Sequence, residues 1–155
     1  MKKMKNFRII YLIGLITILF SACETYDEYA VERDTVAGFS KKSNNINNVP
    51  TGTGNVKSIE VALFVSDVSN VDRQFNIVKV PTILDLTTIP PQVETNPENY
   101  SFDSTVTIPA NSRTGVITVS GTNISMVNKK EYFSLGVEGS ENVISGSLTT
   151  IRLKR

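Results

Sequence analysis

Few side chains in this sequence could carry out chemistry. The chain has no histidine and a single cysteine, Cys23. Histidine is the commonest general base and metal ligand, so its absence removes most acid–base and metal-dependent mechanisms. A serine nucleophile would need lysine as its base, yet Lys129-Lys130 lies in no Ser-x-x-Lys pattern. We therefore expect no catalytic residue, cofactor or metal. A small hydrolase with paired carboxylates is the lesser alternative, because such pairs meet only in space.

The sequence before Cys23 is typical of an export signal. Four basic residues lie within the first eight positions, and residues 9–20 are largely apolar. As a helix this run would be roughly 18 Å long at ~1.5 Å per residue, whereas a bilayer has a hydrocarbon core of about 30 Å. A basic start, a short apolar region and the small residues Ser21-Ala22 predict a cleaved signal peptide over residues 1–22. A lone helix is expected over about residues 6–21.

The segment Leu19-Phe20-Ser21-Ala22-Cys23 resembles the lipobox of bacterial lipoproteins. In that family the cysteine thiol is lipidated and the cysteine becomes the first residue of the mature chain. Phe20 replaces the usual leucine three positions before the cysteine and keeps that position apolar. The resemblance implies a palmitate-bearing membrane anchor at Cys23 and an outer-membrane location, exposed at the cell surface. The alternative is a cysteine buried in a core.

Residues 23–34 are acidic and show neither helical nor strand periodicity, which predicts a solvated tether. Within it, Glu24, Asp27 and Glu28 lie where some Gram-negative lipoproteins have a surface-export signal. That similarity implies a role for these acids in reaching the cell surface. An ordinary linker is the alternative.

The charge of the mature chain differs from that of the precursor. Residues 1–22 hold four basic and no acidic residues, so their removal leaves twelve Lys and Arg against fifteen Asp and Glu, a net charge of −3. This balance argues against nucleic acid as a partner. About 130 residues suit one domain, expected over residues 35–155.

Alternation of apolar and polar residues predicts about seven short strands and few helices. The expected strands are residues 35–39, 59–65, 75–80, 101–108, 114–120, 131–137 and 147–153. Two long irregular stretches separate some of them: residues 43–55, rich in Asn and Gly, and residues 81–97, which contain Pro90 and Pro91. Short strands joined by turns predict an all-β fold, a single antiparallel sandwich.

The middle of this region resembles a Calx-beta domain. Tyr100-Ser101-Phe102 leads to Thr-Val-Thr-Ile-Pro-Ala at residues 105–110, and Ile117-Thr118-Val119 follows. Residues 131–135 are similar to a later strand of that family. The chain is also similar to uncharacterised domains of lipoproteins from outer-membrane glycan-uptake systems. Both resemblances imply an immunoglobulin-like sandwich.

Calx-beta domains of ion exchangers bind calcium through clustered carboxylates, so the resemblance raises the question of a calcium site. Calcium requires six to eight oxygen ligands. In this sequence the acids are scattered, and the nearest pairs are Asp67 with Asp72 and Glu138 with Glu141. We expect no metal site.

Binding is the remaining kind of function. Tyr100 and Tyr132 are candidate contacts for a glycan, or else half-buried strand tyrosines. The two long irregular stretches are the alternative contact surface, because binding residues often lie on loops. The sequence predicts an accessory or interaction module with a protein or glycan partner. The alternative is a glycan-binding lipoprotein of an uptake system.

Overall fold

The computed structural model describes residues 33–155, and residues Asp34–Arg155 form one compact unit. The predicted signal helix, Cys23, and the acids Glu24, Asp27 and Glu28 lie outside the described residues. Within residues 33–155, no helix has the length and apolar character needed to span a bilayer.

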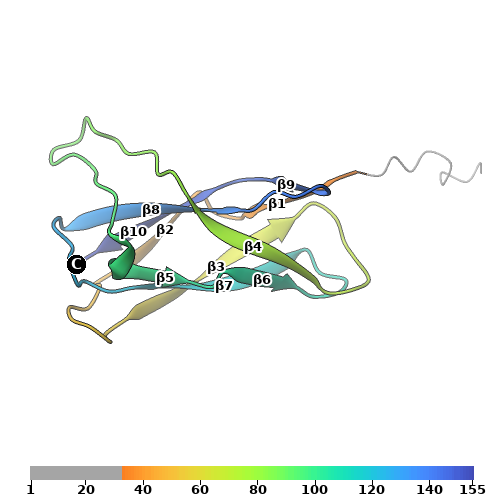
Figure 1. The fold of residues 1–155 in the computed structure, drawn as a ribbon, viewed down its shortest axis with the longest axis horizontal. Coiled ribbons are helices and arrows are strands. Elements are labelled where there is room, and N and C mark those ends of the chain that lie inside the picture. The colour runs from red at the N-terminus through yellow and green to blue at the C-terminus, as the bar shows by residue number, and fades with distance from the viewer. Residues whose placement is uncertain (1–32) are drawn as a thin grey trace, which may run out of the picture. The chain divides into compact units, whose positions relative to one another are not determined.

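Two five-stranded sheets face each other across an apolar core (Figure 1). Sheet A has the strand order β5-β7-β3-β1-β9 and sheet B the order β2-β10-β8-β4-β6. The prediction of an all-β fold is confirmed, but the expected seven strands are ten. In chain order, the elements are β1 (Thr35–Phe39), β2 (Ser43–Asn47), β3 (Lys57–Val65), β4 (Arg73–Val80), the 3₁₀ helix η2 (Pro97–Asn99), β5 (Tyr100–Phe102), β6 (Thr105–Ile108), β7 (Thr114–Gly121), β8 (Lys130–Val137), β9 (Val143–Ser145) and β10 (Thr149–Lys154).

The core is built from the inward face of each strand. Every second residue of β3 from Val61 to Val65 is buried, as its period-two pattern predicts. Burying one such side chain contributes about 1.5–3 kcal/mol. In the strand expected over residues 147–153, Ile151 and Leu153 are fully buried, whereas Leu148 is 42% exposed and lies outside the core. The positions of the alternating apolar residues therefore determine which face of each strand is buried.

Residues 43–47 were expected to belong to a loop and instead form β2. The strand pairs in parallel with β10 over five residues, from Ser43 opposite Thr150 to Asn47 opposite Lys154. Its one apolar residue, Ile46, is fully buried. Backbone pairing and the burial of this side chain outweigh the turn preference of the surrounding asparagines.

Residues 101–108 were expected to form one strand and instead form two, in different sheets. β5 pairs with β7 in sheet A, and β6 pairs with β4 in sheet B. The crossing is held at Asp103, whose backbone N–H donates to the Thr118 carbonyl (3.1 Å) and whose Oδ2 accepts from the Thr118 N–H (2.7 Å). Two hydrogen bonds at one residue therefore hold the chain at the point where it leaves sheet A.

The first two strands of the unit pair with the last two, and both pairs are parallel, unlike the antiparallel sandwich expected. β1 is parallel to β9 in sheet A, and β2 is parallel to β10 in sheet B. Gly38 of β1 allows a close approach here, because a Cβ at this position would clash with the backbone nitrogen of Ser147. β8 runs from the end of the sandwich where β10 ends to the end where β1 begins (Figure 1). At ~3.3 Å per residue, an eight-residue strand separates these ends by roughly 25 Å.

Candidate functional site

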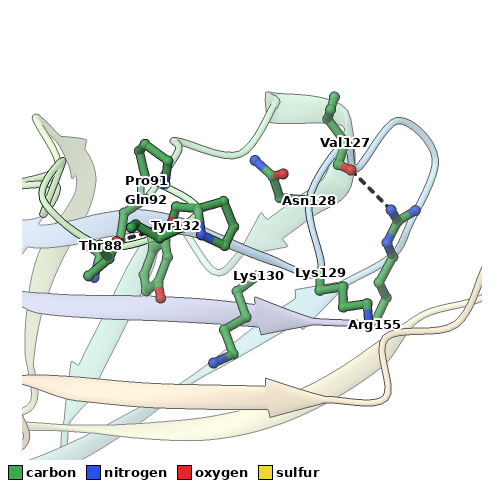
Figure 2. A pocket seen from close by; sticks show the side chains of 11 residues that line it. Thr88, Pro91, Gln92, Val127, Asn128, Lys129, Lys130, Tyr132 and Arg155 are labelled. Carbon is green, nitrogen blue, oxygen red and sulfur yellow. Dashed lines mark hydrogen bonds between the residues drawn. The ribbon is translucent and has the colours of Figure 1, made fainter.

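A pocket of about 580 Å³ lies where β8 begins and β10 ends. Three segments that are distant in sequence line it (Figure 2): residues 88–92 of the connection from β4 to β5, residues 127–130 with Tyr132, and Arg155. Figure 2 shows the Tyr132 ring beside the proline-containing segment and Arg155 on the far side. The pocket therefore joins the proline connection to the start of β8.

The connection from β4 to β5 is fixed to β8 by backbone pairing. The Tyr132 N–H donates to the Val93 carbonyl (3.0 Å), and the Thr95 N–H donates to the Tyr132 carbonyl (2.9 Å). The same edge of β8 pairs with β4 only from Ser134 onward. Residues 93–95 therefore occupy the place beside β8 that β4 leaves open.

Glu94 adds a charged contact to this attachment. Its carboxylate forms an ion pair with Lys79 of β4 and accepts a hydrogen bond from the Thr82 hydroxyl (3.1 Å). The hydrogen bond from Lys79 lowers the pKa of Glu94, against a smaller opposing effect of burial. Glu94 is thus ionised and paired over the neutral pH range.

The tip of the connection is closed on itself. The Gln92 N–H donates to the Asp85 carbonyl (3.1 Å), and the Asp85 N–H donates to the Gln92 side-chain oxygen (3.0 Å). The Asp85 carboxylate accepts from the hydroxyl and the N–H of Thr87, and these hydrogen bonds lower its pKa. Beyond this closure Ile89 is 98% exposed. The tip is therefore an ordered loop with an apolar side chain in solvent.

A buried carboxylate holds the opposite wall. Glu131 is 2% exposed, and its Oε1 accepts from the N–H groups of Val127 (2.7 Å) and Asn128 (3.1 Å). The Arg155 guanidinium donates to the Val127 carbonyl (3.0 Å), and the Arg155 N–H donates to the Lys129 carbonyl (3.2 Å). These four hydrogen bonds set the backbone from which Lys129 and Lys130 project.

The structure separates the two candidate tyrosines. Tyr132 is half-buried and lines the pocket together with Pro90 and Pro91, so the aromatic candidate and the loop candidate form one site. Tyr100 is also half-buried, but its ring stacks on Phe133 of the facing sheet, with centroids 3.9 Å apart. Burial raises the pKa of Tyr100. Tyr100 therefore contributes to the packing between the sheets and lies apart from the pocket lining.

Of the two carboxylate pairs considered for calcium, Asp67 and Asp72 have other partners. Asp67 forms an ion pair with Arg73 (2.9 Å), and the Asp72 carboxylate accepts from the Ala110 N–H (2.8 Å). Burial raises the pKa of Asp67, but its polar contacts with Thr35 and Arg73 outweigh this, so the pKa is lowered overall. Among residues 33–155, no three His, Cys, Asp or Glu side chains are grouped in a way that could hold a metal ion.

The polar and cationic lining was not predicted from the sequence. A signal for part of it exists: Lys129-Lys130 precedes one expected strand, and Lys154-Arg155 follows another. Antiparallel pairing of these strands places Lys130 opposite Lys154. The amide groups of Gln92 and Asn128 come from irregular segments and have no comparable pattern.

No protein-family model matches this sequence, and no curated protein matches it. Solved structures of similar fold were found. A candidate carbohydrate-binding protein of Bacteroides ovatus is similar at TM-score 0.57 and 10% identity, over 77% of this chain and 36% of that one. The apo form of the Calx CBD1 domain is similar at TM-score 0.53 and 9% identity, over 79% of this chain and 97% of that one. The fold is Calx-beta-like.

A third similar structure is a multidomain Bacteroides ovatus protein that includes a DUF1735 region, at TM-score 0.55 and 16% identity. The match covers 78% of this chain and 45% of that protein. The chain thus spans less than half the length of these two Bacteroides proteins and nearly all of the Calx domain. At these identities, the comparisons show a Calx-beta-like β domain and carry no site residues over to this chain.

Proposed function

We propose that the Calx-beta-like domain is a non-catalytic glycan-binding module, with its binding site in the pocket at Tyr132. The observation that carries the proposal is a pocket that combines an aromatic ring with convergent polar groups. Its volume of about 580 Å³ lies within the usual range of about 300–1,000 Å³ for small-molecule sites. The amides of Gln92 and Asn128 and the hydroxyl of Thr88 offer donors and acceptors suited to sugar hydroxyls.

The lining favours binding over hydrolysis. Among its eleven residues there is no carboxylate, and a glycosidase needs two. The buried Glu131 is engaged by two backbone N–H groups and serves the wall of the pocket. The likeness to a candidate carbohydrate-binding protein supports the same proposal at the level of fold.

The position of the pocket suits an anchored protein. We propose that the chain is exported and lipidated at Cys23, and that its immunoglobulin-like sandwich is displayed at the outer-membrane surface. Within residues 34–155, the pocket lies at the end of the sandwich away from the start of β1. Cys23→Ala should abolish metabolic palmitate labelling, and labelling that persists would refute the anchor.

Changing Glu24, Asp27 and Glu28 to Ala should protect the domain from protease added to intact cells.

The glycan proposal is tested by Tyr132→Ala, with titration of purified protein against cell-surface and plant polysaccharides. Loss of a stacking aromatic should weaken the binding of a recognised glycan about tenfold or more, since such contacts are worth roughly 0.5–1.5 kcal/mol beyond the area they bury. Phe64→Ala is the matched control, because Phe64 is an aromatic residue, 44% exposed, on a strand of the other sheet. Equal binding by both variants would place the ligand elsewhere.

A protein partner is the second candidate. The outer face of sheet A exposes four large apolar residues, Val36, Phe64, Val116 and Ile144, each 39–53% accessible. β1, β3, β7 and β9 contribute one residue each, and these strands are adjacent in the sheet. An apolar face of this kind favours a protein contact. Phe64→Ala should weaken such a contact and leave glycan binding unchanged, so the same pair of variants separates the two candidates.

A further inference from the structure

We infer that the pocket takes an acidic saccharide, one whose carboxylate or sulfate groups meet the cations around Tyr132. This inference rests on the proposed glycan-binding function and adds the chemical class of the ligand. Lys129, Lys130 and Arg155 line the pocket, and no acidic residue does. Within residues 33–155, none of these three cations forms an ion pair.

The carboxylates near the pocket are already engaged. Glu131 lies behind the wall and accepts from two backbone N–H groups. Asp85 accepts from Thr87, and Glu94 pairs with Lys79. The three lining cations thus have no direct carboxylate partner among the described residues, and an anionic ligand could pair with them.

The strand register adds two more cations to the same end of sheet B. Lys154 lies directly opposite Lys130, and Arg152 lies directly opposite Tyr132. Like charges opposite each other in a sheet are destabilising, so the Lys130–Lys154 pair lowers stability unless an anion binds beside it. The Arg152 Nε is buried and has no hydrogen-bond partner among the described residues. This second observation shows that one donor of the Arg152 guanidinium lacks an acceptor at this end of sheet B.

The concentration of positive charge at this end does not follow from the general composition. Residues 35–155 hold eleven Lys and Arg and ten Asp and Glu, a net charge of only +1. A nearly neutral domain that places three cations in the lining of one pocket, and two more on the paired strand β10, has a local site for anions. A concave pocket with one aromatic residue and two amides fits a saccharide unit better than the extended basic stripe used for nucleic acid.

The test uses the full chain in a nonionic detergent and isothermal titration calorimetry with defined probes. Oligogalacturonate and its methyl ester share the same sugar chain but carry charged and neutral carboxyl groups respectively, and sulfated and plain dextran oligosaccharides form the second pair. At least one anionic probe should bind more tightly than its neutral partner. Raising NaCl from about 0.05 to about 0.5 M should weaken that binding, since screening shortens the reach of the charges. If the galacturonate pair shows this difference, the recognised group is a carboxylate; if the dextran pair shows it, the recognised group is a sulfate.

The matched variants are Lys129→Gln/Lys130→Gln/Arg155→Gln and Lys41→Gln/Lys42→Gln/Arg113→Gln. Both remove two lysines and one arginine, and the second set is exposed and lies outside the pocket lining. The first should lose about tenfold in affinity, equal to ~1.4 kcal/mol, because exposed ion pairs each contribute modestly. The control should lose none. Lys129→Gln/Lys130→Gln alone keeps the Arg155 contact with Val127 and guards against an effect on folding.

The outcomes separate the inference from the proposed function. Binding of neutral saccharides that depends on Tyr132 and not on salt or the lysines would overturn the acidic ligand and leave the glycan function standing. Binding of no saccharide would overturn both. Equal binding of a single-stranded oligonucleotide would show non-selective anion attraction and would also overturn the inference.

Discussion

Replacing Glu131 tests how the pocket wall is held. Glu131 is a fully buried carboxylate on β8, and one of its oxygens accepts from the N–H groups of both Val127 and Asn128. Glu131→Ala removes the acceptor and leaves two backbone donors unpaired beside the pocket. Glu131→Gln keeps a neutral acceptor oxygen for the two N–H groups, while it removes the charge and replaces the second oxygen with an NH2 group.

The hydrogen bonds set the size of the effect. A hydrogen bond to a charged group contributes about 1.5–3 kcal/mol, and a neutral one about 0.5–1.5 kcal/mol. Val127 itself is 77% exposed, so water partly replaces what its N–H loses, and we take values near the lower limits. Glu131→Ala should therefore lower the free energy of unfolding by about 3 kcal/mol, and Glu131→Gln, which keeps two neutral bonds, by about 2 kcal/mol.

Equilibrium urea unfolding at neutral pH measures both changes, provided that the slope with denaturant stays constant. Glu60→Ala is the control, because Glu60 is an exposed acid of β3 and should change stability by less than about 0.5 kcal/mol. A loss for Glu131→Ala no greater than that of Glu60→Ala would refute the role of the carboxylate. Equal losses for the Ala and Gln variants would show that acceptance by its oxygen is not what matters.

Further predictions concern the core, an ion pair, a close approach and calcium. Tyr100→Ala should lower the free energy of unfolding by about 2–4 kcal/mol, whereas Tyr100→Phe keeps the stack on Phe133 and should cost less than about 1 kcal/mol; equal losses in urea unfolding would contradict the stacking role. Asp67→Asn should lower the free energy of unfolding by about 0.2–1 kcal/mol at pH values above the ordinary Asp pKa of about 3.9. The difference between the two proteins should vanish as the pH falls through the lowered pKa of folded Asp67, because the pairing with Arg73 is then lost in the parent protein too. A difference in stability that persists at pH 2 would argue against the ion pair. Gly38→Ala should destabilise by about 1–3 kcal/mol, since its Cβ would meet the backbone between β9 and β10, and an unchanged melting temperature would show that this backbone can move. The melting temperature should be the same in millimolar calcium and in chelator, and a rise of several degrees with calcium would reveal a metal site.

The sequence predicted the strands whose apolar residues alternate over a long run, such as residues 59–65. It could not predict the break at residues 103–104, because Phe102, Val106 and Ile108 keep the same period through the crossing. The alternation of apolar residues indicates only which side of the chain faces the core. Because the core lies between the two sheets, the alternation does not indicate which sheet a strand belongs to. A chain that changes sheets at this point keeps its pattern unchanged. The missed strand β2 has one buried apolar residue, Ile46, and its partner β10 lies over a hundred positions away.

The candidate site was predicted in pieces. Tyr132 and the segment containing Pro90 and Pro91 were each identified, but as rival surfaces, because sequence distance hides their contact. Backbone pairing of Val93 and Thr95 with Tyr132 brings them together. The same limit explains the unpredicted cations: Arg155 reaches the pocket only because β10 ends beside the start of β8.

The position of β1 has a mechanical consequence. β1 lies inside sheet A, bonded to β3 on one side and to β9 on the other. Hydrogen bonds between strands run across the strand axis, so tension along β1 loads both ladders at once, in shear, and does not peel them apart one bond at a time. The pocket lies at the far end of the sandwich, so a pull on a ligand bound there would be transmitted along the strands towards Thr35. A domain pulled in this direction resists extension with all the bonds of its first strand together.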